Sequence, residues 1–95
     1  MAKITFIWDT EKAAQNLRKH KISFEEASSV FFDENAHEFF DSGHSIKEDR
    51  FLMLGISFRF RVLVVSYCIR EKGRQIRIIS ARKATAKEQK AYKGN

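Results

Sequence analysis

Cationic residues follow an apolar run near the end of this 95-residue chain, in a pattern suited to binding phosphate. In the segment 77–85, strand-forming residues are followed by Ser80, Arg82 and Lys83, and helix-forming residues come next. An arginine presents its donors as a planar fork that matches a phosphate or a carboxylate. Strand alternation puts Ser80 and Arg82 on the face of Ile78, so we expect both where the core ends and a cleft begins. The alternative is that Arg82 pairs with an acidic residue of a neighbouring strand.

A second cationic cluster, RKHK at 18–21, ends the first expected helix. Lys19 and its neighbours can serve the helix alone, because cations at a helix C-terminus bind its free carbonyl groups. His20 differs from them because histidine is the side chain that ordinarily exchanges a proton near neutral pH. The pattern is compatible with a helix-capping histidine and with a functional one.

Further arginines stand at the ends of expected strands. Arg50 ends the segment KEDR at 47–50, where an ion pair with the adjacent acids is the alternative to a functional role. Arg61 and Arg70 flank a long apolar strand. By alternation Arg61 shares a face with Tyr67, whose hydroxyl group then needs a partner in the core. The residues that we expect to bind a polyanionic backbone are Arg61, Arg70, Ser80 and Lys83.

These residue types describe a site for phosphodiesters. RNA carries its own nucleophile, the 2′-hydroxyl, so its cleavage needs alignment, a proton donor or acceptor, and cations where charge develops on the phosphate. His37 and His44 lack the spacing of metal ligands, and no phosphate-cradling glycine motif is present, so we expect no metal and no cofactor. The same residues are compatible with a ribonuclease, with a nucleic-acid-binding module that does not cut, and with a protein-interaction domain.

Charge is unevenly distributed along the chain, whose net charge is +6. From residue 70 onward there are nine Lys and Arg against two Glu, which suggests a polyanionic partner. Residues 25–49 carry eight Asp and Glu against one Lys, which is unsuited to non-specific coating of nucleic acid. The single cysteine, Cys68, lies in an apolar run and is expected to be buried in a protein of the reducing cytoplasm. No apolar run reaches the roughly 20 residues that span a bilayer.

The hydrophobic patterns predict one α+β domain covering residues 1–95. The expected strands are 3–8, 36–40, 50–58, 61–70 and 75–80, and the expected helices are 9–20, one opening at Ser23, and 85–92. Ser23 with Glu26 and Thr85 with Glu88 have the spacing of capping boxes. Short links between successive strands favour an antiparallel sheet, and we expect the helices to pack on one of its faces.

Three separated motifs resemble the BrnT family of toxins. They are W-D-x-x-K-x-x-x-N-x-x-K-H-x-x-S-F-E-E-A at 8–27, D-R-F-L-M-L-G at 49–55, and R-I-I-S-A-R-K-A-T-x-x-E-x-x-x-Y at 77–92. The resemblance covers nearly the whole chain apart from 33–48. It implies a bacterial type II toxin with a RelE-like fold, two N-terminal helices and one C-terminal helix, which cleaves RNA and thereby inhibits translation.

The resemblance also implies partners and site residues. A BrnA-type antitoxin binds such a toxin tightly and supplies the DNA-binding module, so the toxin meets DNA only through it, commonly as two toxins with two antitoxins. The motif positions fall on Lys19, His20, Asp49, Arg50, Ser80, Arg82, Glu88 and Tyr92.

From the residues and the resemblance together we predict a division of roles. Arg82 is expected to bind the scissile phosphate, Arg50 and Lys19 to share that work, and His20 to act as the general acid or base. We also expect the acidic middle of the chain and the apolar edge of the sheet to face the antitoxin, with Glu25, Glu26 and Asp33 as the acids that test this.

Overall fold

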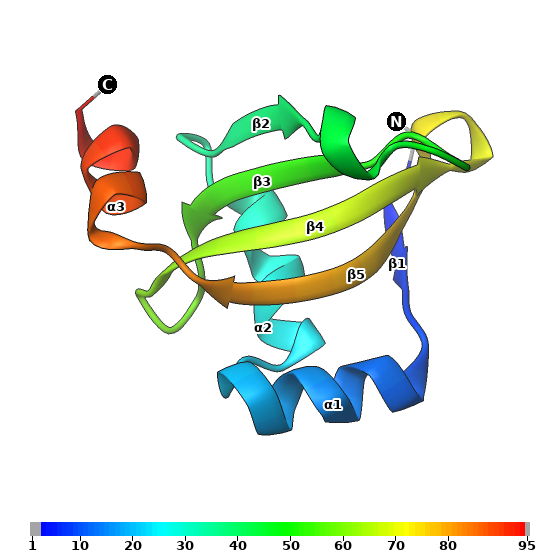
Figure 1. Cartoon of the computed structure of the whole chain (residues 1–95), viewed down its shortest axis with the longest axis horizontal. Coiled ribbons are helices and arrows are strands. Elements are labelled where there is room, and N and C mark those ends of the chain that lie inside the picture. The colour runs from blue at the N-terminus through cyan, green and yellow to red at the C-terminus, as the bar shows by residue number, and fades with distance from the viewer. Residues whose placement is uncertain (1–2, 95) are drawn as a thin grey trace.

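A five-stranded sheet in the order β1-β5-β4-β3-β2 organises the chain (Figure 1). The computed structural model describes residues 3–94. The strands are β1 (Thr5–Ile7), β2 (His37–Phe40), β3 (Phe51–Ile56), β4 (Val62–Arg70) and β5 (Gln75–Lys83). The α-helices are α1 (Thr10–His20), α2 (Phe24–Ser29) and α3 (Ala86–Lys93), and three short 3₁₀ turns are η1 (Val30–Phe32), η2 (Ser42–His44) and η3 (Glu71–Gly73). The predicted α+β class is confirmed. No helix in the described part of the chain has the length and apolar character needed to cross a membrane.

The sheet is mixed, whereas the short links between strands predicted an antiparallel one. β1 pairs in parallel with β5, and the other neighbouring strands are antiparallel. Parallel neighbours need a long connection, and here the connection includes every other strand of the sheet. Pairing between the first and last strands therefore depends on the completed fold, which is why the local pattern did not indicate it.

The main core lies between the sheet and the first two helices. Phe24, Ala27 and Val30 pack against the face of the sheet that carries Leu63 and Val65. Tyr67 lies in the same layer and is 1% exposed, and its hydroxyl group donates a hydrogen bond to the carboxylate of Glu38. The hydroxyl partner that Tyr67 was predicted to need is thus present. We call this side of the sheet the helix-covered face.

A β-bulge changes the direction of the last residues of β5. Tyr67 pairs with Ile78 and Ser66 pairs with Ser80, so Ile79 is an extra residue in the ladder. The predicted alternation was therefore wrong beyond Ile78: Ala81 continues the buried line, while Ser80 and Arg82 point to the other face. The strand also continues to Lys83 instead of ending at Ser80.

The C-terminal helix packs on the face of the sheet opposite to α1 and α2. Tyr92 packs with Leu54, Val64 and Ala84 in a second, smaller apolar cluster. The expectation that all helices share one face was wrong for α3, because the bulge and the link through Ala84 turn the chain across the sheet. The predicted capping box of Thr85 and Glu88 is present in both directions and begins α3. The Tyr92 hydroxyl group donates to Asp33 Oδ2 at 2.6 Å and fixes the other end of the helix.

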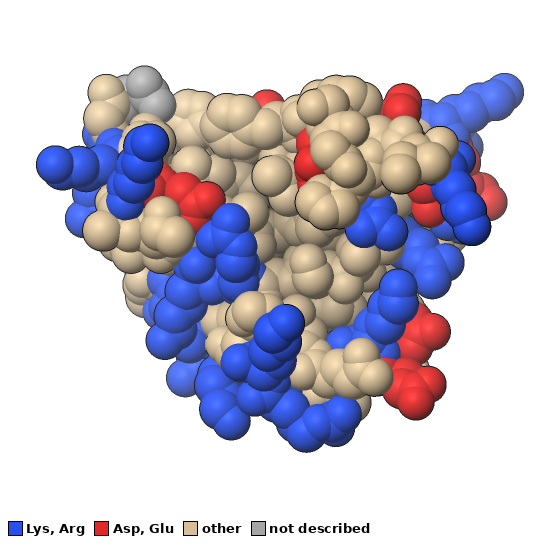
Figure 2. Space-filling view, in the orientation of Figure 1, with Lys and Arg blue, Asp and Glu red and all other residues tan. Residues whose placement is uncertain are grey.

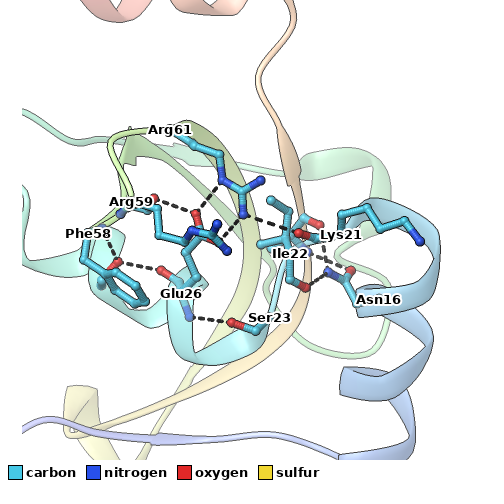
Figure 3. Close-up of polar contacts among 11 residues, drawn as sticks. Asn16, Lys21, Ile22, Ser23, Glu26, Phe58, Arg59 and Arg61 are labelled. Carbon is cyan, nitrogen blue, oxygen red and sulfur yellow. Dashed lines mark hydrogen bonds and ion pairs between the residues drawn. The ribbon is translucent and has the colours of Figure 1, made fainter.

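A buried polar cluster joins α1, α2 and the free edge of β5 (Figure 3). The amide Nδ2 of Asn16 donates to the carbonyl oxygens of Ile22 and Ala81, both at 2.9 Å. The Ala81 N–H donates to Asn16 Oδ1 at 3.1 Å. β1 ends opposite Arg77, so no strand covers β5 at Ala81, and the Asn16 amide takes the place of a strand partner there.

Glu26 is the acidic member of the same cluster and is 1% exposed. Its backbone N–H donates to Ser23 Oγ, as the predicted capping box required. Its carboxylate does not return to the Ser23 backbone, however, because it accepts from the Ser57 hydroxyl group and from two nitrogens of Arg61. Burial favours the neutral acid, but these hydrogen bonds outweigh it and hold the pKa of Glu26 below its ordinary value.

Candidate functional site

The sheet face opposite to α1 and α2 is left partly uncovered, and we call it the open face. Its floor is one row across three strands, formed by Ser80, Ser66 and Leu52. α3 covers the neighbouring row on one side, where Arg82, Val64 and Leu54 lie. Figure 2 views this side of the molecule, and Lys and Arg side chains border a shallow hollow of uncharged residues. The surface can therefore receive an elongated anionic ligand.

An arginine cluster lies on the other side of the floor. Cys68 pairs with Arg77, and continuation of the β3–β4 register puts Arg50 beside Cys68 as well. Arg50 and Arg77 are therefore separated by two strand spacings of roughly 4.8 Å each. Arg70 follows on the same face of β4, and its Nη2 donates to both oxygens of Glu48 at 3.0 and 3.1 Å. We define the arginine cluster as Arg50, Arg70 and Arg77.

The charges of the arginine cluster act on two neighbouring groups, Cys68 and Glu48. Burial raises the pKa of the Cys68 thiol, the Glu48 carboxylate raises it further, and the charges of Arg50 and Arg70 oppose both effects. Desolvation works against ionisation of Glu48 too, but Arg70 and Arg77 help to hold the pKa of its carboxyl group below the ordinary value. Glu48 offsets Arg70 and Arg77, and the charge of Arg77 also helps to lower the pKa of the exposed Asp9. Arg50 and Arg77 have no hydrogen-bonded acid within residues 3–94.

Arg82 faces the open floor from the α3 side, and its guanidinium group is already engaged. Nη1 and Nη2 donate to the two carboxylate oxygens of Glu88 at 2.8 and 3.0 Å, in a fork-to-fork pair. The hydrogen bonds from Arg82 lower the pKa of Glu88 to about 2, although burial alone would raise it. The acidic partner predicted as the structural alternative for Arg82 is therefore present, on α3 instead of on a neighbouring strand. The pair is 42% and 32% exposed, so a competing anion has access to it.

One titratable histidine lies beside the arginine cluster. His44 Nδ1 is 3.0 Å from Asp41 Oδ2, which leaves Nε2 directed away from that carboxylate. Its side chain is exposed, and with Arg50, Lys47 and Glu48 it lines a shallow pocket. The sequence reasoning gave this histidine no role, although its partner Asp41 and its pocket lie in the same short segment between β2 and β3.

Four predicted site residues lie on other surfaces. Lys19 and His20 end α1, which runs along the free edge of β5, and neither forms a hydrogen bond or ion pair with Arg50 or Arg82 in the range 3–94. Arg61 is bound by Glu26 on the helix-covered face and also donates to the Lys21 carbonyl group at 3.3 Å (Figure 3). Lys83 is exposed opposite Leu63, beyond the floor. The fold therefore brings together Arg50, Arg70, Ser80 and Arg82 on one face.

Two acids that were expected to face an antitoxin bind donors of their own chain. Glu26 pairs with Arg61, as described above. Asp33 accepts hydrogen bonds from the Ile56 and Asn35 N–H groups as well as from Tyr92. Glu25 is the exposed member of the three. The expectation was wrong for the side chain of Glu26, which is buried and bound to Arg61. Contact of the half-buried Asp33 with an antitoxin stays a prediction.

Arg77 is the open-face residue that the sequence reasoning missed. Simple alternation put it on the face opposite to Arg82, and the bulge at Ile79 returns both to one face. No residue type in the segment marks the bulge, so only the ladder itself could identify Arg77. In the range 3–94, no group of three or more His, Cys, Asp or Glu side chains is arranged to hold a metal ion.

Comparisons with known proteins agree on one family. The family model described as the ribonuclease toxin BrnT of type II toxin–antitoxin systems matches residues 8–88. The crystal structure of the Brucella abortus ribonuclease toxin BrnT is similar in fold, with a TM-score of 0.65 and 22% sequence identity over 90% of this chain and 99% of that one. No curated protein matches the chain in sequence.

Proposed function

Because this chain belongs to the family of BrnT ribonuclease toxins of type II toxin–antitoxin systems, we propose that it binds and cleaves RNA on the open face. The observation that carries the proposal is the arrangement of cations beside an uncovered floor. Of these cations, Arg50 and Arg77 form no ion pair within residues 3–94. Arg50 and Arg77 flank the buried Cys68 on one side of the floor. Arg82 lies on the other side, in the row next to Ser66 and Ser80. An RNA backbone crossing this floor would meet guanidinium groups on both sides.

The proposed chemistry uses the nucleophile that RNA carries. The 2′-oxygen attacks the adjacent phosphorus, the bond to the 5′-oxygen breaks, and a 2′,3′-cyclic phosphate forms. One proton leaves the 2′-hydroxyl group and one is delivered to the departing 5′-oxygen. Arg50 and Arg77 would stabilise the negative charge that develops on the phosphate oxygens. Arg82 would join them by exchanging its contact with Glu88 for one with the phosphate.

The residue that transfers protons is the part of the site on which the structure gives the fewest contacts. We assign this role to His44. Its ring lines the pocket beside Arg50, and Asp41 can fix the tautomer that leaves Nε2 free. His20 and Lys19, the choices made from sequence, would need to reach the open face from the end of α1. Both histidines are therefore tested separately below.

A ribonuclease toxin of a type II toxin–antitoxin system has an antitoxin as its partner and RNA as its substrate. The finer assignments belong to the proposal: a BrnA-type antitoxin, a complex of two toxins with two antitoxins, contact with DNA only through the antitoxin, and action in the cytoplasm. Cleavage is proposed to inhibit translation and to need no metal ion or cofactor.

The test is cleavage of RNA by the purified chain, freed of antitoxin and assayed in EDTA. Arg50→Ala and Arg77→Ala are each expected to slow cleavage about 100-fold, as loss of one charge-stabilising donor typically does. Arg18→Ala is the matched control, because it removes the same charge from an exposed position on α1. Equal activity of all three variants would overturn the site. Abolished cleavage in EDTA would overturn the metal-independent chemistry.

A pair of variants distinguishes phosphate binding by Arg82 from a purely structural role of its ion pair with Glu88. Arg82→Lys keeps the charge and loses the fork, so cleavage should fall while folding persists. Glu88→Gln removes the same ion pair but leaves the Arg82 fork free, so its cleavage should be retained. Equal losses in both variants would mean that Arg82 only holds α3.

His44→Ala should lose cleavage and His20→Ala should not. The reverse result would restore the choice made from sequence.

A non-catalytic module that binds RNA is the second candidate, because the arginine cluster alone accounts for backbone binding. Such a module would show salt-dependent affinity without product, and His44 would be dispensable in it.

A further inference from the structure

The outer edge of β2 has no strand beside it within residues 3–94. β2 is the last strand in the order of the sheet, and it forms the upper margin of the sheet in Figure 1. Natural edge strands are commonly protected by short length, charged side chains, proline or a bulge; β2 is short and carries Glu38, but no lysine, proline or bulge occurs within His37–Phe40. Its two phenylalanines, Phe39 and Phe40, are 50% and 54% exposed on opposite faces of the sheet. Such an edge is a template for a further strand.

The ladder identifies which backbone groups the edge offers. The Asp41 N–H donates to the Arg50 carbonyl group at 2.8 Å, which makes positions 41 and 50 a hydrogen-bonded pair. Antiparallel ladders alternate, so Phe39 is bonded to β3 while Glu38 and Phe40 direct their N–H and C=O groups outward. Within residues 3–94, the outward N–H and C=O groups of Glu38 and Phe40 form no hydrogen bond with a turn, loop or helix cap. The edge therefore presents two donors and two acceptors at strand spacing.

The charge around the edge selects the kind of strand that fits. Glu34 precedes β2 and is exposed, Glu38 lies within it, and Asp41 follows it at once. A second copy of this chain would bring the same acids opposite one another, which is unfavourable. A strand that carries arginine or lysine between apolar residues would pair with these acids and cover Phe39 and Phe40.

We propose that the β2 edge is the docking site for an extended, cationic and apolar segment of the antitoxin, which adds a sixth strand to the sheet. The inference rests on the proposed function only for the identity of the partner. The binding mode follows from the edge itself: backbone bonds supply affinity, and alternate side chains supply selectivity.

Amide hydrogen exchange in the toxin–antitoxin complex tests this directly. The Glu38 and Phe40 amides are expected to exchange roughly tenfold more slowly, or slower still, in the complex than in the free chain. The Phe39 amide, which already bonds to β3, is the internal control and should change much less. Unchanged exchange at Glu38 and Phe40 within an intact complex overturns the proposal and leaves the ribonuclease assignment untouched.

A backbone-specific variant supplies the second readout. Phe40→Pro deletes an outward N–H group without removing a bond to β3, and Phe40→Ala deletes the ring alone. If a strand docks here, Phe40→Pro should weaken the complex about tenfold more than Phe40→Ala does, with RNA cleavage by the free chain retained. Equal affinities of the two variants would overturn strand addition. If the unmodified chain does not cleave RNA but the Glu38 and Phe40 amides still exchange more slowly in the complex, only the ribonuclease proposal fails.

A synthetic peptide of alternating arginine and valine makes the edge testable without the antitoxin. It should slow exchange of the Glu38 and Phe40 amides, while a peptide of alternating glutamate and valine should not. If no antitoxin complex forms, the assignment of the antitoxin as partner fails. The peptide still tests whether the β2 edge accepts an added strand. No protection by the arginine peptide at millimolar concentration overturns the proposal.

Discussion

Replacing Asn16 by alanine should destabilise the fold more than any other change on α1, because its amide substitutes for a missing strand. Three buried backbone groups depend on that amide: the carbonyl oxygens of Ile22 and Ala81, and the Ala81 N–H group. A buried polar group that loses its partner costs about 1 to 3 kcal/mol. The low end of this range for all three groups predicts a loss of about 3 kcal/mol.

A loss of this size is a large part of the stability of a small domain and is readily measured. Urea unfolding followed by the fluorescence of Trp8 should show it, and the melting temperature should fall by roughly 12 °C or more. Gln15→Ala is the matched control, because Gln15 is exposed on the same helix and should change stability by less than about 0.5 kcal/mol.

Asn16→Leu separates hydrogen bonding from packing. Leucine branches at Cγ as asparagine does and has the same number of side-chain heavy atoms, but it has neither donor nor acceptor, so its variant should be about as unstable as Asn16→Ala. A loss below about 1 kcal/mol in Asn16→Ala, or full recovery in Asn16→Leu, would refute the role of the amide as a strand substitute.

Two further predictions concern packing and pH. Gly55→Ala should destabilise the chain by about 1 to 3 kcal/mol in urea unfolding, because the new Cβ would lie 2.8 Å from Val30 Cγ1; Gly43→Ala, whose Cβ would meet no atom closer than 3.7 Å, should be nearly neutral. The folded state lowers the pKa of Glu88 from 4.5 to about 2, so its ion pair with Arg82 stabilises the fold fully above pH 4.5 and progressively less down to pH 2. Unfolding measured across this range should show a smaller pH dependence in Glu88→Gln, and an unchanged dependence would contradict the assignment.

Within the N-terminal motif, several of the residues that carry the family resemblance make contacts that hold the fold together. Asn16 covers the edge of β5, Ser23 caps α2, and Glu26 anchors Arg61. The sequence therefore identified the family correctly while the role of many motif residues stayed open. A motif shows which residues occur together, but a buried ion pair and a phosphate-binding arginine look alike in it.

The sequence by itself determined what depends on near neighbours along the chain. The start of α3 follows from Thr85 and Glu88 three residues apart, and the buried Tyr67 follows from strand alternation. Local hydrogen-bonding rules and side-chain periodicity suffice for such features, and they also suffice for the α+β class.

Only the tertiary structure decided which face each functional side chain occupies. The bulge at Ile79 turns Ser80 and Arg82 to the open face and aligns Arg77 with them. The parallel pairing of β1 with β5 and the position of α3 arise from segments far apart in the sequence. The physical reason is that one extra residue reverses every later side chain in a strand, and the free energy that selects it comes from long-range packing, which local sequence does not encode.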